Sequence, residues 1–573
     1  MKDWKLGADG FIMHYMVAGP KVKEYTTRTR SSNQLTFEGK LRSFIGTEKE
    51  KLIDPIVKLG KKADNGSTWK PYYSYGSYFI DLSSFYSTLQ RVDLNVATSL
   101  CVEEDIKVDA VVWTYMAVGI YCNGQLIGEQ KPPTYKPIQK KEIILPLKKG
   151  KNLIYLKCEN LGVRDTKNII GMQIKNHQDR IKVQLPDHTY QDKAYEDIKF
   201  LDHIEIVDYQ VVFPSVAPKG TYIIYREISP DYDIMSKPPM SSNVSGMERV
   251  EIPKDISQIE IKKENDGISI SRQLEITERI KPIFTPKTLT IKDNYHYMME
   301  QIAQVGSLDR GSHGFAITNL LARKYTHKEM KKDRNLLFDT LRLIDLRVDC
   351  SDFLLSGLLR YMHNYDLDED VSEKIKEVLL RYRYWMTMDG ADAMCFWSEN
   401  HSLMFYTSAM DVGKLYPEEY FTRAKMTGKK LYEYGRDKVI QWLEDVETYG
   451  FEEFLSTVYM NVTFAALLNV IDYAEEEISQ RASALTDKLL FDLCTHTFKG
   501  CVIAPMGRTY RGVIYPFLQG TQAIINLIDT SAPYSYGEGW IAYLATSKYQ
   551  LPDGLLERTK ENLEITYDSG NGK

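Results

Sequence analysis

The sequence has few of the features that mark disulfide-rich, metal-binding or membrane proteins. Its seven cysteines are an odd number and contain no CxxC pair, so neither a disulfide framework nor a zinc ribbon is indicated. No run of about 18 uncharged apolar residues occurs, and the N-terminus is not apolar, so we expect no membrane span and no signal peptide. Reduced thiols in a cytoplasmic protein fit best, although a secreted chain that has lost its signal peptide would look the same.

An excess of charge of one sign is also lacking. The 573 residues include 73 basic and 78 acidic side chains, which gives a formal net charge of −5. No global positive field therefore exists to hold a nucleic acid or an anionic membrane. Proline and glycine are sparse, at 21 and 35 residues, and 43% of the chain is hydrophobic, as in an ordinary folded protein. The length allows about three or four structural units, or fewer if one is a large helical domain.

Several enzyme motifs are absent, namely HExxH, GxxxxGK[ST], GxGxxG after a strand and GxSxG. The ten histidines are dispersed, so no local metal spacing exists and we expect no metal and no cofactor. A metal assembled from distant segments stays an alternative. Aromatic residues are abundant: 39 Tyr, 20 Phe and 7 Trp make 12% of the chain. Such rings suit a protein that stacks on sugars, and the edges of a hydrophobic core explain many of them equally well.

The first half of the sequence alternates between apolar and polar residues, as β-strands do. The run from Ala110 to Ile127 breaks at Asn123-Gly124, the commonest two-residue hairpin turn, and residues 142–160 predict a second hairpin around residues 149–152. This pattern resembles the jelly-roll, galactose-binding-like sandwiches that accompany many glycosidases. The resemblance implies a sugar-binding module, and a purely structural sandwich is the alternative.

After Pro286 the apolar residues take helical spacing. Eight clear helical segments lie between residues 293 and 498, and two weaker ones lie near 314–325 and 538–547. Successive pairs share no fixed-period similarity, which favours a closed toroid of paired helices over a solenoid. The chain therefore resembles the (α/α) toroid polysaccharide lyases and glycosidases that also carry β-sandwich domains, without pointing to one named family. It has fewer helices than these enzymes and ends where a further strand begins.

The sequence thus predicts a multidomain α+β protein. Residues 1–200 are expected to form the galactose-binding-like β-sandwich, and residues 201–288 a further β region or linker. Residues 289–550 are expected to form the toroid-like catalytic domain, and residues 551–573 a C-terminal strand or a truncated β domain. In toroid families the cleft lies at the ends of the inner helices, so polar clusters at helix starts are the candidate sites.

The densest polar cluster lies at residues 389–401. Asp389 and Asp392 precede Trp397, and a helix then opens with Ser398, Glu399, Asn400 and His401. Helix capping and the helix dipole explain a serine and a glutamate at this point. They do not explain an amide and an imidazole beside a tryptophan. A stacking ring, an amide and a proton-transferring imidazole together predict a sugar subsite, with a well-satisfied helix start as the alternative.

A second cluster, Arg347, Asp349 and Asp352, lies at another helix start. The two aspartates, at positions i and i+3, can share one face of a helix. Arg347 can then hold a substrate carboxylate or one of these aspartates. Helix capping with a structural ion pair is the alternative.

A third cluster is the loop at residues 507–512, in which Arg508 and Arg511 flank Tyr510. Such a loop can present guanidinium groups to an anionic sugar, and a solvated turn is the alternative. Tyr459, within the helix expected after residues 448–450, is a further candidate, although a tyrosine in such a helix is more often part of a core.

Two reactions on a poly- or oligosaccharide compete. The resemblance to toroid lyases implies β-elimination on a uronate, with Asn400 and an arginine neutralising the carboxylate and His401 or a tyrosine as base. A tyrosine such as Tyr406 would then be the acid. In hydrolysis, Glu399 would be the general acid and an aspartate the base. The excess of tyrosine and the adjoining Asn400 and His401 favour elimination.

A third hypothesis is a non-catalytic glycan-binding or scaffold protein. It predicts that Glu399, Asn400 and His401 pair with protein groups instead of lining a pocket. In all three hypotheses the partner is a carbohydrate and not a nucleic acid or a membrane. The sequence gives no indication of the oligomeric state.

Overall fold

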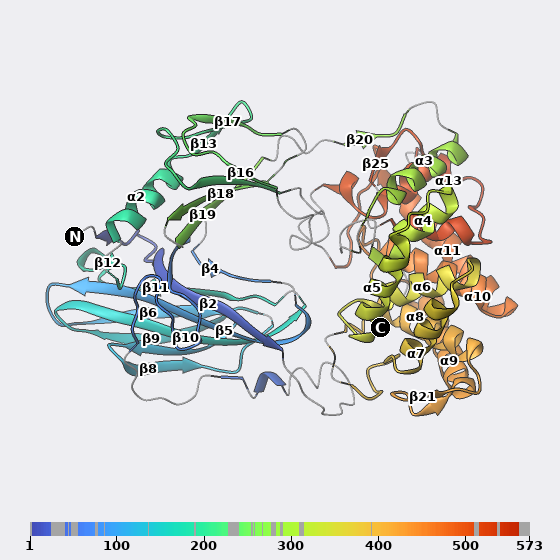
Figure 1. The fold of residues 1–573 in the computed structure, drawn as a ribbon, viewed down its shortest axis with the longest axis horizontal. Helices are drawn as coiled ribbons and strands as arrows, with labels where there is room; N and C mark the ends of the chain where they lie inside the picture. The colour runs from blue at the N-terminus through green and yellow to red at the C-terminus, as the bar shows by residue number, and fades with distance from the viewer. Residues whose placement is uncertain are drawn as a thin grey trace. The chain divides into compact units, whose positions relative to one another are not determined.

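The computed structural model describes residues 3–24, 41–43, 45–46, 55–74, 78–84, 86–135, 137–164, 166–187, 191–226, 240–253, 256, 258–265, 268–276, 282–286, 290–306, 308, 315–390, 392, 394–508, 515–535 and 539–560. The chain divides close to residue 280 into a β-rich unit and a helical unit (Figure 1). The prediction of a mixed multidomain protein with a β half and a helical half is confirmed at this level.

Two antiparallel sheets form a sandwich in the β-rich unit. The first sheet has the order β1-β12-β5-β10-β7-β8, with β2 beside β5 and β3 beside β2, and the second has the order β4-β11-β6-β9. Leu94 and Val96 of β5 point to the same face, since side chains alternate along a strand. They are fully buried in one core with Val108 and Val112 of β6.

The strands of the sandwich are β1 (Trp4–Lys5), β2 (His14–Glu24), β3 (Lys70–Tyr73), β4 (Ile80–Asp81), β5 (Tyr86–Val102), β6 (Ile106–Thr114), β7 (Ala117–Cys122), β8 (Gln125–Gln130), β9 (Gln139–Leu147), β10 (Gly150–Arg164), β11 (Ile169–Ile174) and β12 (Lys182–Gln184), with η1 (Gln178–Arg180) before β12.

The first predicted hairpin is confirmed and the second is wrong. β7 pairs with β8 across Asn123 and Gly124, whose φ angles of 50° and 80° suit a type I′ turn. The turn at residues 148–150, in contrast, crosses between the sheets: β9 pairs with β6, while β10 pairs with β5 and β7. Each strand buries one face against the same core, so alternation is identical in the two arrangements. The buried Asn152 side chain fixes the crossing through both backbone groups of Lys148, at 2.8 and 2.7 Å.

The second β region packs against the outer face of the first sheet. It comprises α2 (Gln191–Asp202), β13 (Glu205–Val207), β14 (Gln210–Val212), β15 (Thr221–Arg226), β16 (Met240–Asn243), β17 (Arg249–Glu251), β18 (Gln258–Asn265) and β19 (Ile268–Glu275). Trp69, Tyr121 and Tyr155 from the sandwich share a core with Ile223 and Ile259 from this region. Both regions therefore belong to one compact unit, and α2 is a helix that the sequence pattern did not predict.

The helical unit contains α3 (Ile291–Ala303), α4 (Thr318–Thr326), α5 (Asp333–Asp345), α6 (Ser351–Asn364), α7 (Glu369–Leu380), α8 (Glu399–Leu415), α9 (Gly428–Tyr449), α10 (Met460–Tyr473), α11 (Glu476–Thr495), α12 (Gln522–Ile528) and α13 (Leu555–Arg558). Short elements complete it: β20 (Ile283–Phe284), η3 (Phe315–Ile317), β21 (Tyr420–Phe421), β22 (Met426–Thr427), β23 (Thr497–Phe498), β24 (Cys501–Val502), η5 (Pro516–Leu518), β25 (Pro533–Tyr534) and η6 (Trp540–Thr546).

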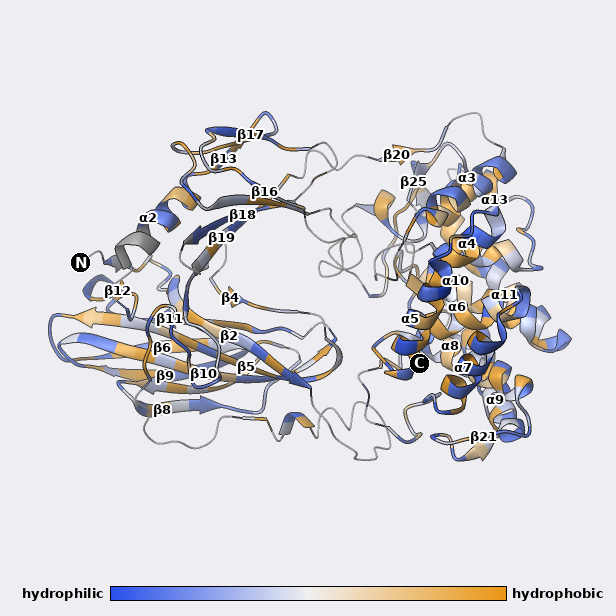
Figure 2. Cartoon of the chain, in the orientation of Figure 1, coloured by the Kyte–Doolittle hydropathy of each residue, from blue (hydrophilic) through white to orange (hydrophobic). Residues whose placement is uncertain are grey.

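These helices alternate between two kinds. Helices α6, α8, α10 and α12 are buried on nearly every face, whereas α3, α5, α7, α9 and α11 bury one stripe and expose the other (Figure 2). The pairs α3–α4, α5–α6, α8–α9 and α10–α11 are in contact, and α12 contacts α3. The buried helices, to which α4 belongs by its position and burial, are called the inner helices below.

Three segments differ from the sequence-based expectation. The helix predicted over residues 417–446 begins only at Gly428, because β21 and β22 form a small hairpin before it. The weak segment at 538–547 contains the 3₁₀ helix η6, and α12 was not predicted. The expected C-terminal strand after residue 560 lies outside the described residues.

Glycines allow α8 and α9 to approach each other closely. A Cβ atom on Gly413 would lie 2.4 Å from the backbone nitrogen of Tyr432, and one on Gly435 would lie 2.3 Å from that of Met410. Side chains larger than hydrogen would force these backbones apart. This contact fixes the position of α8, whose first residues belong to the candidate site.

Gly435→Ala is expected to lower the free energy of unfolding by about 1–3 kcal/mol. Helix propensity alone would favour alanine by about 1 kcal/mol, so a loss identifies the backbone contact as its cause. The midpoint of unfolding in urea measures the effect. Glu433→Ala, at an exposed position of the same helix, is the matched control and should change stability by less than about 0.5 kcal/mol. Stabilisation by Gly435→Ala would contradict the close approach.

Candidate functional site

The starts of the inner helices carry most of the predicted site residues. Asp352 lies in the first turn of α6, residues 399–401 open α8, and Tyr459 directly precedes α10. Arg347 and Arg508 lie in loops that lead to inner helices. Helix starts present unpaired backbone N–H groups and a partial positive charge, which is why acidic and amide side chains gather there.

Glu399 is buried at the start of α8. Its Oε2 atom accepts hydrogen bonds from the backbone N–H groups of Glu452 and Glu453, the second at 3.1 Å. Its Oε1 atom has no hydrogen-bond partner among the described residues. Burial raises the pKa of Glu399 to about 8, the nearby Glu453 carboxylate adds to this effect, and the two amide donors oppose it. The Glu399 carboxyl is therefore protonated at neutral pH.

A cavity of about 370 Å³ lies beside Glu399, within the usual size range of small-ligand sites. Five aromatic side chains line it: Trp385, Trp397, Tyr406, Trp442 and Tyr449. Trp442 donates to the backbone carbonyl of Glu399 at 3.1 Å, and Trp397 is 37% exposed. Two further carboxylates, Asp445 and Glu452, also line the cavity. The cavity therefore combines flat apolar surfaces with three acidic groups.

Asn400 and His401 adjoin Glu399 but are not among the residues that line this cavity. The Asn400 side chain donates to Glu453. His401 Nδ1 lies 2.7 Å from Asp352 Oδ2, its Nε2 lies 3.9 Å from the thiol of Cys350, and its ring stacks on Phe353 at 4.6 Å. Both polar side chains are buried and bound to protein groups.

Glu453 is a central residue of the site that the sequence did not reveal. Its Oε2 accepts from the backbone N–H and the side chain of Asn400, and its Oε1 accepts from Arg508 Nη1 at 2.7 Å. The Arg508 guanidinium lies over the buried Tyr459 ring, 4.1 Å from its centre. In the sequence Glu453 reads as an ordinary acid before a helix, and only its burial distinguishes it.

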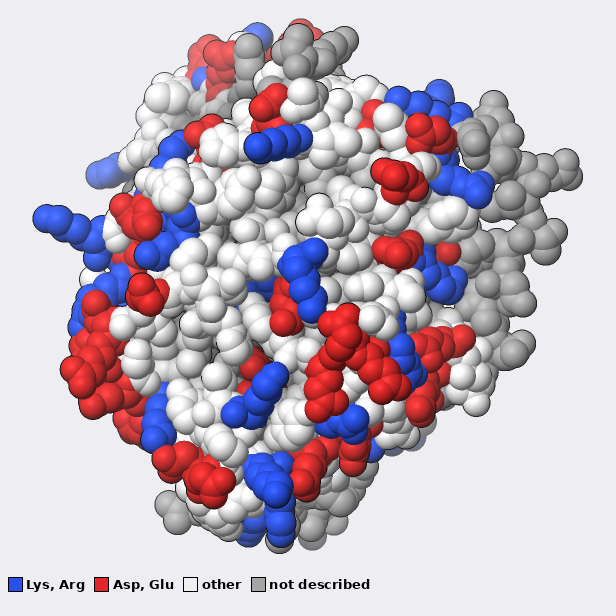
Figure 3. Space-filling view, turned by 90° about the vertical axis from the view of Figure 1, so that its right-hand side faces the viewer, with Lys and Arg blue, Asp and Glu red and all other residues white. Residues whose placement is uncertain are grey.

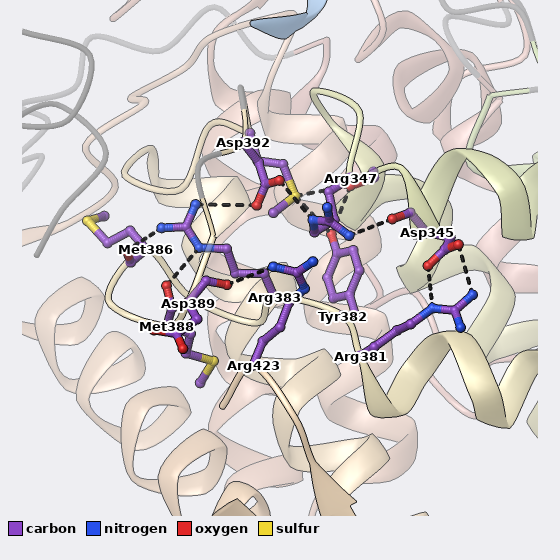
Figure 4. Close-up of polar contacts among 12 residues, drawn as sticks. Asp345, Arg347, Arg381, Tyr382, Arg383, Met386, Met388, Asp389, Asp392 and Arg423 are labelled. Atoms are coloured by element: carbon purple, nitrogen blue, oxygen red, sulfur yellow. Dashed lines mark hydrogen bonds and ion pairs between the residues drawn. The ribbon is translucent and has the colours of Figure 1, made fainter. Parts of the chain in front are cut away.

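Arg347 and Asp392 form an ion pair close to the start of α6, in a second polar cluster apart from the cavity beside Glu399 (Figure 4). Arg347 Nε lies 2.8 Å from Asp392 Oδ1. Asp392 Oδ2 lies 3.4 Å from Nη1 of Arg383, a fully buried residue that was not predicted. Asp389, from the same loop, pairs with Lys425 at 2.6 Å.

The remaining predicted residues have separate surroundings. Asp349 is buried and accepts from the backbone N–H of Cys395 at 3.0 Å. Neither Asp349 nor Asp389 or Asp392 lines the cavity beside Glu399. Tyr510 and Arg511 lie outside the described residues.

The described residues contain neither a candidate metal-binding group nor a candidate membrane-spanning helix. No group of three or more His, Cys, Asp or Glu side chains in the described part of the chain is arranged to hold a metal ion. Among these same residues, no helix is long and apolar enough to cross a membrane.

Comparisons with known proteins give only distant similarities. No protein-family model matches the sequence, and no curated protein matches it. A family 35 carbohydrate binding module from an environmental isolate is 17% identical, with a TM-score of 0.14, and the match covers 28% of this chain and 95% of the module. A GH78 family rhamnosidase of Bacillus sp. GL1 is 10% identical, with a TM-score of 0.28, and the match covers 85% of this chain and 62% of the rhamnosidase.

An α-L-rhamnosidase from Aspergillus terreus is 9% identical, with a TM-score of 0.24, over 96% of this chain and 81% of that enzyme. TM-scores of this size establish no common fold. The function is therefore argued below from the geometry of the chain itself.

Replacing Glu399 should change how stability depends on pH. Between pH 4.5, the ordinary pKa of a glutamate, and pH 8 the unfolded chain releases this proton while the folded chain keeps it. The contribution of Glu399 to the free energy of unfolding therefore falls as the pH rises through this window. Glu399→Gln lacks this loss, so its stability relative to the wild type should increase from pH 4.5 to pH 8, as measured by urea denaturation.

Glu433→Gln, at an exposed position on α9, serves as the control and should show a constant difference from the wild type. A constant difference for Glu399→Gln as well would contradict a carboxyl that is held neutral by burial.

Proposed function

We propose that this chain is a glycoside hydrolase that acts in the cavity beside Glu399. The observation that carries the proposal is a buried carboxyl, with one oxygen lacking a partner among the described residues, at a cavity lined by five aromatic rings. Tryptophan and tyrosine rings are the side chains that best cover the apolar faces of sugars. A carbohydrate is therefore the substrate class that this wall fits best.

Glu399 is the general acid in this proposal. Two backbone amides occupy Oε2, so the proton is carried by Oε1 and needs an acceptor. Oε1 is buried in the structure, so the carboxyl would first have to turn toward the cavity; a glycosidic oxygen bound there would then supply that acceptor and take the proton as its bond to the anomeric carbon breaks. Asp445 or Glu452, which line the same cavity, would take a proton from the water that adds to the anomeric carbon.

This choice of base replaces the aspartates expected from the sequence. Asp392 is bound between two arginines, Asp389 is paired with a lysine, and Asp349 accepts from a backbone amide. None of the three lines the cavity beside Glu399, so none is placed to take a proton from a water bound there.

Hydrolysis is favoured over elimination by the surroundings of the adjoining residues. An eliminating base needs a free nitrogen at the substrate, whereas His401 is bound through Nδ1 to Asp352 and faces the Cys350 thiol through Nε2. The amide that would neutralise a uronate belongs to Asn400, which donates to Glu453. Tyr406 lines the cavity, but burial raises the pKa of its hydroxyl, which makes it a weaker acid and keeps it protonated.

The toroid arrangement and the sugar-binding role of the sandwich belong to the same proposal. Alternation of buried and amphipathic helices, together with the contact between α12 and α3, supports a closed ring of helix pairs. The free thiols of all seven cysteines support a cytoplasmic location, where thiols stay reduced.

Glycan binding without catalysis is the second candidate function. It is favoured by one observation: Asn400 and His401 are bound by protein groups and do not line the cavity, as that hypothesis expects, whereas Glu399 is bound through Oε2 and also lines the cavity. The aromatic wall would serve such a binding protein equally well.

Glu399→Gln is expected to lower kcat by about 10²–10⁴-fold, because glutamine cannot donate the proton, while oligosaccharide binding is retained. Release of reducing ends from a panel of neutral and acidic oligosaccharides measures hydrolysis. The ultraviolet absorbance of an unsaturated uronate, followed in parallel, measures elimination.

Glu433→Gln is the matched control and should hydrolyse like the wild type. Unchanged turnover in Glu399→Gln would exclude this residue as the acid. Oligosaccharide binding by the wild type without release of either product would favour the second candidate function.

A further inference from the structure

Arginine and aspartate side chains from the loops before α6 and α8 meet others from the hairpin formed by β21 and β22 (Figure 4). Five of these side chains are cationic and three are aspartates. The cations are Arg347, Arg381, Arg383, Arg423 and Lys425, and the aspartates are Asp345, Asp389 and Asp392. The cluster, called the arginine cluster below, therefore has an excess of two positive charges. Glu377 does not change this excess, because it binds Arg381 and is itself paired with Lys374.

Asp392 is the centre of the arginine cluster. Its two oxygens lie 2.8 Å from Arg347 Nε and 3.4 Å from Arg383 Nη1. Arg383 also donates to the backbone carbonyls of Met386 and Met388, at 2.6 and 3.0 Å. Each guanidinium nitrogen of Arg383 therefore has a protein acceptor. The Asp392 carboxylate is shared between Arg347 and Arg383.

The other two aspartates are bound by other cations. Asp345 binds Arg381 with both oxygens, at 2.6 and 2.8 Å, and Asp389 binds Lys425 at 2.6 Å. Arg423 is left with the backbone carbonyl of Asp389, 3.1 Å from its Nη1. Within the described residues, no carboxylate lies at ion-pair distance from Arg423.

The positive charge of Arg423 is partly buried and lies near that of Arg347. Burial lowers the pKa of Arg423, the like charge of Arg347 lowers it further, and Asp392, Asp345 and Asp389 oppose this effect. Burial likewise lowers the pKa of Arg383; Asp392 opposes this effect, and the other two arginines add to it. Three guanidinium groups thus lie close together, and only Asp392 forms ion pairs with two of them. A half-buried charge of this kind is stabilised by a further counter-ion.

Donors remain available for such a counter-ion. Arg347 uses Nε and Nη1, and Arg423 uses Nη1. The Nη2 atoms of both arginines donate no hydrogen bond to the described residues, and both side chains are partly exposed. Guanidinium groups bind planar or tetrahedral oxyanions through their N–H groups.

We propose that Arg347 and Arg423 bind the carboxylate or sulfate group of an acidic sugar, with Arg383 positioning Asp392 and the loop that carries it. The choice of an acidic sugar as the ligand rests on the proposed function, because the loop that carries Asp392 also contributes to the cavity beside Glu399. Trp385 and Met386 line the cavity beside Glu399, and the Met386 carbonyl is held by Arg383. An acidic unit in this subsite would be one neighbour of the sugar in the cavity.

The chain as a whole carries no excess of positive charge. On the face of the molecule that Figure 3 shows, Lys and Arg side chains are interspersed with Asp and Glu side chains. The formal net charge of the chain is −5. Attraction of anions is therefore expected to be local and to depend on the arginines of the cluster.

Calorimetric titration of the full chain at low ionic strength tests the subsite, with glucuronate, glucose and inorganic sulfate as probes. Glucuronate is expected to bind the wild type, and glucose to bind about tenfold or more weakly. Arg423→Gln should weaken glucuronate binding by about tenfold or more, because a charge-assisted hydrogen bond is lost. Arg481→Gln, in which the replaced arginine pairs with Glu447 on the surface, is the matched control and should bind as the wild type does.

Equal affinity of wild type and Arg423→Gln for glucuronate would overturn the proposal, as would equal binding of glucuronate and glucose. Binding of sulfate without binding of glucuronate would assign the cluster to free inorganic anions and overturn the acidic-sugar ligand. The salt dependence of glucuronate binding by the wild type needs no variant: affinity should fall as ionic strength rises, and a salt-independent affinity would contradict a charged subsite. Glu399→Gln separates this proposal from hydrolysis, because it should bind glucuronate normally while its turnover is lost.

Discussion

A carboxylate buried between two helix starts holds the candidate site together. Glu453 accepts hydrogen bonds from Asn400 at the start of α8 and from Arg508, while its own backbone N–H binds Glu399. Removing a carboxylate from water costs several kcal/mol unless it is paired and hydrogen-bonded. The three contacts therefore depend on one another. Because Glu399 lies beside this negative charge and is itself buried, the proton that makes it an acid depends on Glu453.

The same principle joins the inner helices elsewhere. Arg360 of α6 is fully buried and binds Asn469 and Asp472 of α10, both at 2.7 Å, and the Tyr543 carbonyl of η6 at 3.0 Å. Apolar contacts alone would allow such helices to slide, whereas a buried guanidinium needs its acceptors in fixed directions. The close glycine contact between α8 and Gly435 on α9 adds a steric constraint on the outer side. Polar contacts inside and glycine outside thus fix where the first residues of α8 lie.

Particular residues show how far the sequence predicted this arrangement. Asn123-Gly124 specified its hairpin, because both residues tolerate the left-handed backbone that the turn requires. Residues 148–152 carry equally clear turn signals but cross between two sheets, since alternation records only which face is buried and not which strand is the neighbour. The polar helix start at residues 398–401 was recognised from composition. Glu453 and Arg383 were not, because nothing local distinguishes a buried charge from a solvated one.

The sequence by itself determined the β half, the helical half and the presence of Glu399, Asn400 and His401 at the start of one helix. Only the tertiary structure decided that these neighbours have different surroundings: Glu399 lines the cavity, Asn400 contacts Glu453, and His401 contacts Asp352. Successive residues of an α-helix point about 100° apart, which the sequence does specify. What lies in each direction comes from segments about 50 residues away in either direction along the chain, and it is set by the packing of the inner helices.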